Sequence, residues 1–342
     1  MKPITVDVHA HFVPRLLIER FASHHASFPD VRMTGDSRNP SFQFPGGDAT
    51  RPLNPKVADL DDRRAWMDEA GIDHQLLGLW TDIEGYELDA RQGQAWSRLI
   101  NDCMQEALRN EPRFSPLATL PLQDGQLAAE MLEDCLAQGF AGAMIGTLPK
   151  GVNGGMLDDP ALDPFWDAAS RLQAGIFLHP MYVCGDPRVL DYEMVNAISR
   201  VAETSIAVTR LLYSGHLLKY PGVKLVLAHG GAALPYALGR LSRNHQHFGN
   251  MADPIQGFQA LYFDSCIFDP ELLQLLTSKA APDHVMLGSD MPFTIGDPRP
   301  RQVIEGAYLR DAQRRGMLGQ TAQTVFRLRP DCWCPPVSPA SR

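Results

Sequence analysis

Short apolar stretches alternate with amphipathic stretches along almost the whole chain, and this alternation restricts the fold more than any other feature. About eight apolar stretches of strand length are each followed by a segment with helical spacing. Short buried strands separated by helices are typical of parallel sheets. Eight such units within 342 residues predict a single (β/α)8 barrel of the TIM type. An open doubly wound sheet is the alternative, but it normally carries a glycine-rich phosphate loop after an early strand, which this sequence lacks.

Long excursions interrupt this alternation. Residues from about 23 to 55 are rich in Pro, Gly, Ser and Asp and show no sustained period. An excursion of this length inside a compact domain is commonly a lid or a binding loop. We therefore expect one barrel over residues 1–330, with a lid-like insertion at about 23–55 after the first strand, and a Pro-rich tail over 331–342. The last unit is predicted as a strand over 284–290 followed by a helix over 299–315.

Charge and cysteine usage exclude several classes of partner. The chain has 31 Lys and Arg against 40 Asp and Glu, a formal net charge of −9, which argues against nucleic acid or an anionic membrane surface as a partner. No apolar run approaches the roughly 20 residues that a membrane helix needs. The six cysteines are scattered and no secretory leader is evident, so we expect a reduced, cytoplasmic protein.

Residues of metal-ligand type end several of the predicted strands. His9 and His11 alternate with apolar residues in the first strand, so their side chains point to the same side. His179 ends a later apolar strand, His229 follows another and precedes two glycines, and Asp290 ends the last. In a barrel the carboxyl ends of all strands lie on one face. We therefore expect these side chains to converge on a divalent cation.

Each of these residues also has a purely structural interpretation. The first pair can be surface histidines on an edge strand, and His179 can be a hydrogen-bonded core side chain. His229 can belong to a helix-entry turn and Asp290 can cap a turn. Chance placement of all of them at strand ends is the weaker explanation, so the metal site is the hypothesis that we carry forward.

The stretches around these residues resemble the amidohydrolase superfamily. The similarity is strongest to the branch of α-amino-β-carboxymuconate-ε-semialdehyde decarboxylase, which also contains γ-resorcylate, 5-carboxyvanillate and other aromatic-acid decarboxylases. It runs from Thr5 to about Leu328. The stretches that carry it are His9-Ala10-His11, His179-Pro180, His229-Gly230-Gly231 and Gly288-Ser289-Asp290-Met291-Pro292.

The resemblance implies a site built around one metal. It makes His9, His11, His179 and Asp290 the ligands of a divalent cation, and it makes His229 the unligated acid–base group. Zinc suits three imidazoles and a carboxylate with a water in the open position, and manganese also occurs in this branch. Members with two metals use a carboxylated lysine at the fourth strand end. Here that end is Ala143-Met144-Ile145-Gly146, and the next lysine after it is Lys150.

The resemblance also implies contacts to the substrate. Arg51 and Arg240 match arginines that bind substrate carboxylates, and the second is contributed by the partner subunit, which implies a homodimer. A guanidinium pairs bidentately with a carboxylate, although each arginine can equally be a surface or helix-pairing residue. Phe293 and Trp80 are candidates for the apolar wall of a pocket for a planar acid, and core packing is the alternative for each.

Three functions fit this apparatus. The first is a metal-dependent decarboxylase that releases CO2 from an unsaturated or aromatic carboxylic acid, with a metal-bound water or hydroxide and with His229 as acid–base group. The second is a metal-dependent hydrolase of a lactone, amide or related carbonyl compound at the same site. The third is a metal-binding barrel without catalysis. We expect the first; the metal site alone does not separate it from the second, and His229 and the arginines count against the third.

Overall fold

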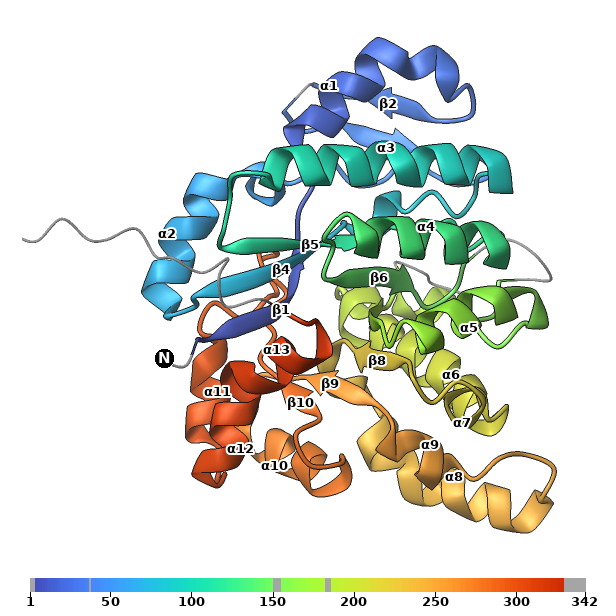
Figure 1. Cartoon of the computed structure of the whole chain (residues 1–342), viewed down its shortest axis with the longest axis vertical. Helices are drawn as coiled ribbons and strands as arrows, with labels where there is room; N and C mark the ends of the chain where they lie inside the picture. The colour runs from blue at the N-terminus through green and yellow to red at the C-terminus, as the bar shows by residue number, and fades with distance from the viewer. Residues whose placement is uncertain (1–3, 37, 150–154, 182–185, 329–342) are drawn as a thin grey trace, which may run out of the picture.

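The computed structural model describes residues 4–36, 38–149, 155–181 and 186–328, and Figure 1 shows the arrangement of their elements. The main strands are β1 (Val6–His11), β4 (His74–Gly78), β5 (Phe114–Ala118), β6 (Gly142–Gly146), β7 (Gly175–His179), β8 (Lys224–Leu227), β9 (Tyr262–Asp264) and β10 (Val285–Met286). The short strands β2 (Arg32–Thr34) and β3 (Ser41–Gln43) form a separate antiparallel pair.

Helices surround the main strands. They are α1 (Arg15–His24), α2 (Leu60–Ala70), α3 (Ala90–Leu108), α4 (Gly125–Ala137), α5 (Asp163–Arg171), α6 (Arg200–Tyr213), α7 (His216–Lys219), α8 (Leu234–Phe248), α9 (Pro254–Gln259), α10 (Pro270–Lys279), α11 (Pro300–Gly306), α12 (Asp311–Arg315) and α13 (Thr321–Val325). None of the described helices is both long enough and apolar enough to cross a lipid bilayer.

Within the described residues, the eight main strands form one parallel sheet in the order β1-β4-β5-β6-β7-β8-β9-β10. The two end strands meet, because the segment after β10 hydrogen-bonds to β1. Val8 N donates to Leu287 O at 2.9 Å, and Asp290 N donates to His9 O at 2.8 Å. The prediction of a (β/α)8 barrel is therefore confirmed.

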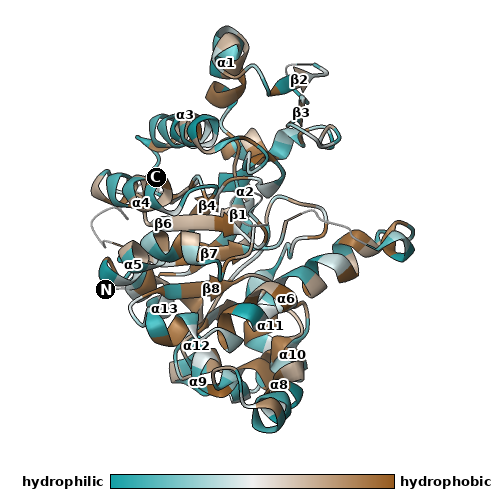
Figure 2. Cartoon of the chain, turned by 90° about the vertical axis from the view of Figure 1, so that its right-hand side faces the viewer, coloured by the Kyte–Doolittle hydropathy of each residue, from teal (hydrophilic) through white to brown (hydrophobic). Residues whose placement is uncertain are grey.

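The strands are apolar because both of their faces are covered, as is usual for parallel sheets in barrels. Every residue of β4, β6 and β7 is buried. Figure 2 shows the hydrophobic colour concentrated on β6, β7 and β8, while the surrounding helices carry hydrophilic colour on part of their surface. One buried cluster combines side chains from several strands with side chains of α13, so the last helix packs against one end of the barrel.

The insertion has an aromatic core of its own, which the sequence pattern did not reveal. Phe21, Phe28, Phe42 and Phe44 pack around Trp96 of α3, with ring centroids 5.3–6.1 Å from the Trp96 ring. The strands β2 and β3 lie in this segment. The excursion over 23–55 is thus held against α3 by buried rings rather than running as an unstructured loop.

The last unit of the barrel differs from its prediction. The strand predicted over 284–290 is only Val285–Met286, and Asp290 lies beyond it with a left-handed backbone of φ 61°. The helix predicted over 299–315 is wrong as a single helix. It is divided into α11 and α12, since Ala307 has an extended backbone directly after Gly306. The predicted tail over 331–342 lies outside the described residues.

Replacing Phe42 by Ala tests the role of the aromatic core. Phe42 is fully buried and contacts Phe21 and Trp96. We expect Phe42→Ala to lower the free energy of unfolding by about 3 kcal/mol in urea titration, because a large cavity replaces the ring. Phe248→Ala is the matched control, since the Phe248 side chain is 63% exposed. Equal losses for both variants would contradict a buried aromatic core in the insertion.

Candidate metal centre and adjoining pocket

Four histidines and one carboxylate meet at the carboxyl ends of the strands. Asp290 Oδ1 lies 3.3 Å from His9 Nε2 and 3.1 Å from His11 Nε2. Asp290 Oδ2 lies 3.5 Å from His229 Nε2. The ring centroid of His179 lies 5.1 Å from that of His9 and 4.7 Å from that of His11. The structure therefore brings together all five residues that the sequence placed at strand ends.

Three of these imidazoles are oriented by a hydrogen bond at Nδ1. His9 Nδ1 lies 2.6 Å from Asp264 Oδ2, and His11 Nδ1 lies 2.9 Å from Leu79 O. His179 Nδ1 lies 2.8 Å from Pro180 O. A carbonyl or carboxylate oxygen only accepts, so each Nδ1 carries a proton and Nε2 is the nitrogen that can offer a lone pair to a metal.

The three Nε2 atoms are buried, and within the described residues they have no partner with hydrogen-bond geometry. Asp290 Oδ1 is also buried and also lacks a partner with hydrogen-bond geometry among the described residues. Buried polar atoms without partners cost free energy unless a ligand satisfies them. Three imidazole lone pairs and one carboxylate oxygen form the donor set that a divalent transition metal prefers. The residues present therefore fit a metal ion.

His229 lies on the other side of the carboxylate. One potential ligand group among the described residues contains one atom each from His9, His179, His229 and Asp290, all within 4.8 Å of one another. This group contains His229 in place of His11. Since Asp290 uses Oδ1 toward His11 and Oδ2 toward His229, the two histidines occupy different sides of one carboxylate. The His229 side chain is also 18% exposed, as a group that exchanges protons with a substrate requires.

Burial and neighbouring charges shift the pKa values of several residues in the cluster. Burial opposes the positive charge of His9, but Asp290 and Asp264 outweigh it and raise the pKa of His9 to about 10. Burial also opposes the negative charge of Asp290, but the nearby imidazoles hold its pKa well below the usual range. Burial and the neighbouring histidines lower the pKa of His179 well below the usual value. A metal ion binding here competes with a proton on His9.

Two members of the cluster have a strained backbone. His229 has φ 55° and Asp290 has φ 61°, both in the left-handed region that L residues avoid. The residues after His229 have to be glycine. A Cβ on Gly230 would lie 2.3 Å from Ile267, and one on Gly231 would lie 2.7 Å from Phe263. The pair of glycines thus allows the chain to turn closely past β9 and to direct His229 toward the cluster.

Asp264 is a functional candidate that the sequence analysis missed. Besides contacting His9, its carboxylate accepts hydrogen bonds from Gly230 N at 2.8 Å and from Cys266 N at 3.1 Å. It therefore fixes both a proposed ligand and the turn that carries His229. The signal was present, because Asp264 ends an apolar strand just as the sequence places Asp290.

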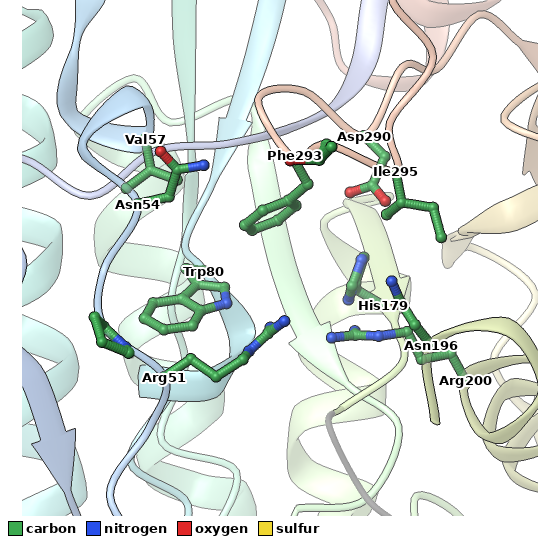
Figure 3. A pocket seen from close by; sticks show the side chains of 12 residues that line it. Arg51, Asn54, Val57, Trp80, His179, Asn196, Arg200, Asp290, Phe293 and Ile295 are labelled. Atoms are coloured by element: carbon green, nitrogen blue, oxygen red, sulfur yellow. The ribbon is translucent and has the colours of Figure 1, made fainter. Parts of the chain in front are cut away.

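A cavity of about 240 Å³ opens beside the cluster and is shown in Figure 3. Arg51, Trp80 and Phe293 line it, as the sequence analysis expected of substrate-binding residues. Arg51 Nη2 lies 3.3 Å from Asp82 Oδ2, which helps to hold the guanidinium at the cavity. Among the described residues, the lining consists of Arg51, Pro52, Asn54, Val57, Trp80, His179, Asn196, Arg200, Asp290, Phe293, Thr294 and Ile295.

Two further arginines differ in their relation to this cavity. Arg240 is exposed on α8 and does not line the cavity of its own chain. Its predicted contribution to the site of a neighbouring subunit stays a prediction. Arg200, at the start of α6, does line the cavity but was not singled out. No local pattern distinguishes Arg200 from other helical arginines, so only the fold reveals it.

Comparison with known proteins places this geometry in a wider group. The family model described as Amidohydrolase matches residues 6–328. The 2-amino-3-carboxymuconate-6-semialdehyde decarboxylase of Dictyostelium discoideum is 26% identical over 349 residues, covering 96% of this chain and 93% of that protein.

Two solved structures resemble the whole fold. The 5-carboxyvanillate decarboxylase from Sphingomonas paucimobilis superimposes with a TM-score of 0.79 at 25% identity, covering 96% of this chain and 100% of that chain. The dihydroxybenzoic acid decarboxylase from Polaromonas sp. JS666 was solved with bound manganese and the inhibitor 2-nitroresorcinol. It has a TM-score of 0.76 at 23% identity, covering 96% of this chain and 99% of that chain.

Metal content tests the assignment of His179 as a ligand. We expect His179→Ala to lose most of the bound divalent metal, because one of four donors is removed. The measurement is elemental analysis of the purified protein. His216→Ala is the control, since His216 is a buried histidine on α7 outside the cluster. Stoichiometric metal in His179→Ala would remove His179 from the ligand set.

Replacement of Asp264 tests whether its charge supports the ligand His9. Asn at position 264 retains an oxygen for the backbone N–H groups of Gly230 and Cys266 but loses the anion beside His9. We expect Asp264→Asn to weaken metal affinity about 10- to 100-fold in a chelator competition assay. Unchanged metal affinity would show that the carboxylate only shapes the turn.

Proposed function

The chain belongs to the amidohydrolase family, and on that premise we propose that it is a metal-dependent decarboxylase of an aromatic or unsaturated carboxylic acid. The observation that carries the proposal is the convergence of three imidazole Nε2 atoms and Asp290 Oδ1 beside a cavity lined by arginine. The decarboxylases from Dictyostelium discoideum and Sphingomonas paucimobilis support it, since each aligns with nearly the whole chain.

His9, His11, His179 and Asp290 hold the divalent cation in this proposal. When bound, the cation supplies Lewis acidity toward an oxygen of the substrate. Three imidazole donors favour zinc, whereas the Polaromonas structure contains manganese. Elemental analysis of protein produced without added metal distinguishes the two.

Proton delivery to carbon is the task of His229. Decarboxylation breaks the bond between the substrate carbon and its carboxylate, CO2 leaves, and the electron pair of that bond remains on carbon. A proton must then reach that carbon. His229 Nε2 lies 3.5 Å from Oδ2 of the cavity-lining Asp290, and an imidazole beside the cavity is the side-chain type that most often transfers protons in catalysis.

In this proposal, residues of the cavity walls bind the substrate. Arg51 offers a guanidinium to an acidic group, and Trp80 and Phe293 offer flat apolar surfaces to a planar ring. A cavity of about 240 Å³ is somewhat smaller than the roughly 300–1,000 Å³ usual for ligand pockets. We infer that the substrate is a small acid with a single ring or a short conjugated chain.

We further propose a homodimer in which Arg240 reaches the site of the neighbouring copy. The exposed position of Arg240 on α8, outside the cavity of its own chain, supports this arrangement. Light scattering measures the assembly. A monomer at catalytic concentrations with full activity would contradict both parts of the proposal.

The decisive experiment incubates the metal-loaded protein with a panel of aromatic and muconate-like acids and follows the products by mass spectrometry. We expect loss of the mass of CO2 from at least one acid. Gain of the mass of water from lactones or amides would instead assign the hydrolase activity that the family name allows.

His229→Ala separates proton transfer from metal binding. We expect this variant to keep its metal and to lose at least about 100-fold in turnover, because the acid–base group is missing. His247→Ala is the control, since His247 is an exposed histidine on α8. Full activity of His229→Ala would exclude His229 from the reaction, and loss of metal would make it a ligand.

A further inference from the structure

The wall of the cavity opposite Arg51 is built by residues that precede and begin α6. A π-helical turn over Val195–Ser199 leads into the helix at Arg200. Asn196 and Arg200 are four positions apart, so they lie on one face of this helical segment, and both line the cavity. Short π-helical segments often occur at functional sites. The local helix geometry thus presents an amide and a guanidinium to the same cavity.

Arg200 is anchored to the metal centre through a single carbonyl. Its Nη1 donates to Pro180 O at 3.1 Å, and the same oxygen accepts from His179 Nδ1 at 2.8 Å. A guanidinium carries five N–H donors in a planar fork, so it can hold a backbone carbonyl and an anionic ligand at the same time. The distance from the metal centre to this cation is therefore set by a backbone atom of the barrel.

Two guanidinium groups face each other across the cavity. Figure 3 shows Arg51 and Arg200 extending into it from opposite walls, with His179 close to Arg200. Asp82 lies 3.3 Å from Arg51 and compensates part of its charge. An anion between the two side chains interacts favourably with both, and the cavity reduces the screening of this interaction by water.

We propose that Arg200 is a specificity-determining residue that binds a second anionic group of the substrate, opposite Arg51. This inference rests on the proposed function, in which the other acidic group is the carboxylate that is lost. It assigns the chain a dianionic substrate, such as a planar dicarboxylate. It also places the second cation within the same chain as the metal ligands, independently of Arg240.

The test compares two simple probes, isophthalate with two carboxylates and benzoate with one. Isothermal titration calorimetry measures their binding to metal-loaded protein at fixed ionic strength. We expect wild-type protein to bind isophthalate more tightly than benzoate. Arg200→Met should weaken isophthalate binding at least about 10-fold and change benzoate binding less than about 2-fold, because a hydrogen bond to a charged group is lost for only one probe.

Arg210→Met is the matched control on the same helix. Arg210 contacts Asp158 through Nε at 2.7 Å and is not part of the cavity lining, so its loss should leave both affinities unchanged. The variant Arg240→Met tests whether the second cation comes from the partner subunit. Loss of the preference for isophthalate in Arg240→Met, but not in Arg200→Met, would overturn the inference in favour of the partner subunit.

Metal content of Arg200→Met is measured in the same samples, because Pro180 connects Arg200 to His179. If Arg200→Met loses metal, the ratio of the isophthalate affinity to the benzoate affinity is measured in Arg200→Lys instead. Lysine keeps the charge but lacks the planar fork. Equal weakening of both probes, or no weakening, would overturn the inference. If Arg200→Met lowers the ratio of isophthalate to benzoate affinity but the wild-type protein decarboxylates no acid, only the proposed function is refuted.

Discussion

Hydrogen bonds to the carboxylate of Asp7 hold the barrel closed where its first and last strands meet. Asp7 is fully buried and accepts from Ser289 N at 3.0 Å, Ser289 Oγ at 2.5 Å and Gln75 Nε2 at 2.7 Å. Gln75 in turn accepts from the buried Arg63. Burial raises the pKa of Asp7 to about 6 and lowers that of Arg63 to about 10. The proposed ligands His9 and Asp290 adjoin this network, since His9 N donates to Asp7 Oδ1 and Asp290 N donates to His9 O.

The metal centre follows from backbone and carboxylate acceptors that the barrel already supplies. Leu79 directly follows β4, Pro180 directly follows β7, and Asp264 is the last residue of β9. Their oxygens take the Nδ1 protons of His11, His179 and His9. The strands therefore place the imidazoles and also choose which nitrogen carries the lone pair. In the proposed reaction His229 transfers the proton, and its position depends on two glycines and a strained turn.

The sequence predicted the barrel and the strand-end cluster because both depend on local patterns. A polar residue directly after an apolar run, such as His179, is visible without coordinates. Asp264 shows the same pattern and was recoverable. Arg200 was not, since its role depends on Pro180, which lies 20 residues earlier in the chain. The packing of the lid-like insertion over 23–55 could not be predicted, because its phenylalanines follow no helical or strand period and meet only around Trp96.

That aromatic core bears on the thermodynamics of ligand capture. Arg51 follows the segment that is pinned to α3, so its backbone is ordered before any substrate arrives. The conformational entropy of ordering this wall is lost during folding rather than during association. Under the proposed function, selectivity comes from the fixed spacing between Arg51 and the proposed metal ligands, which favours acids of matching length.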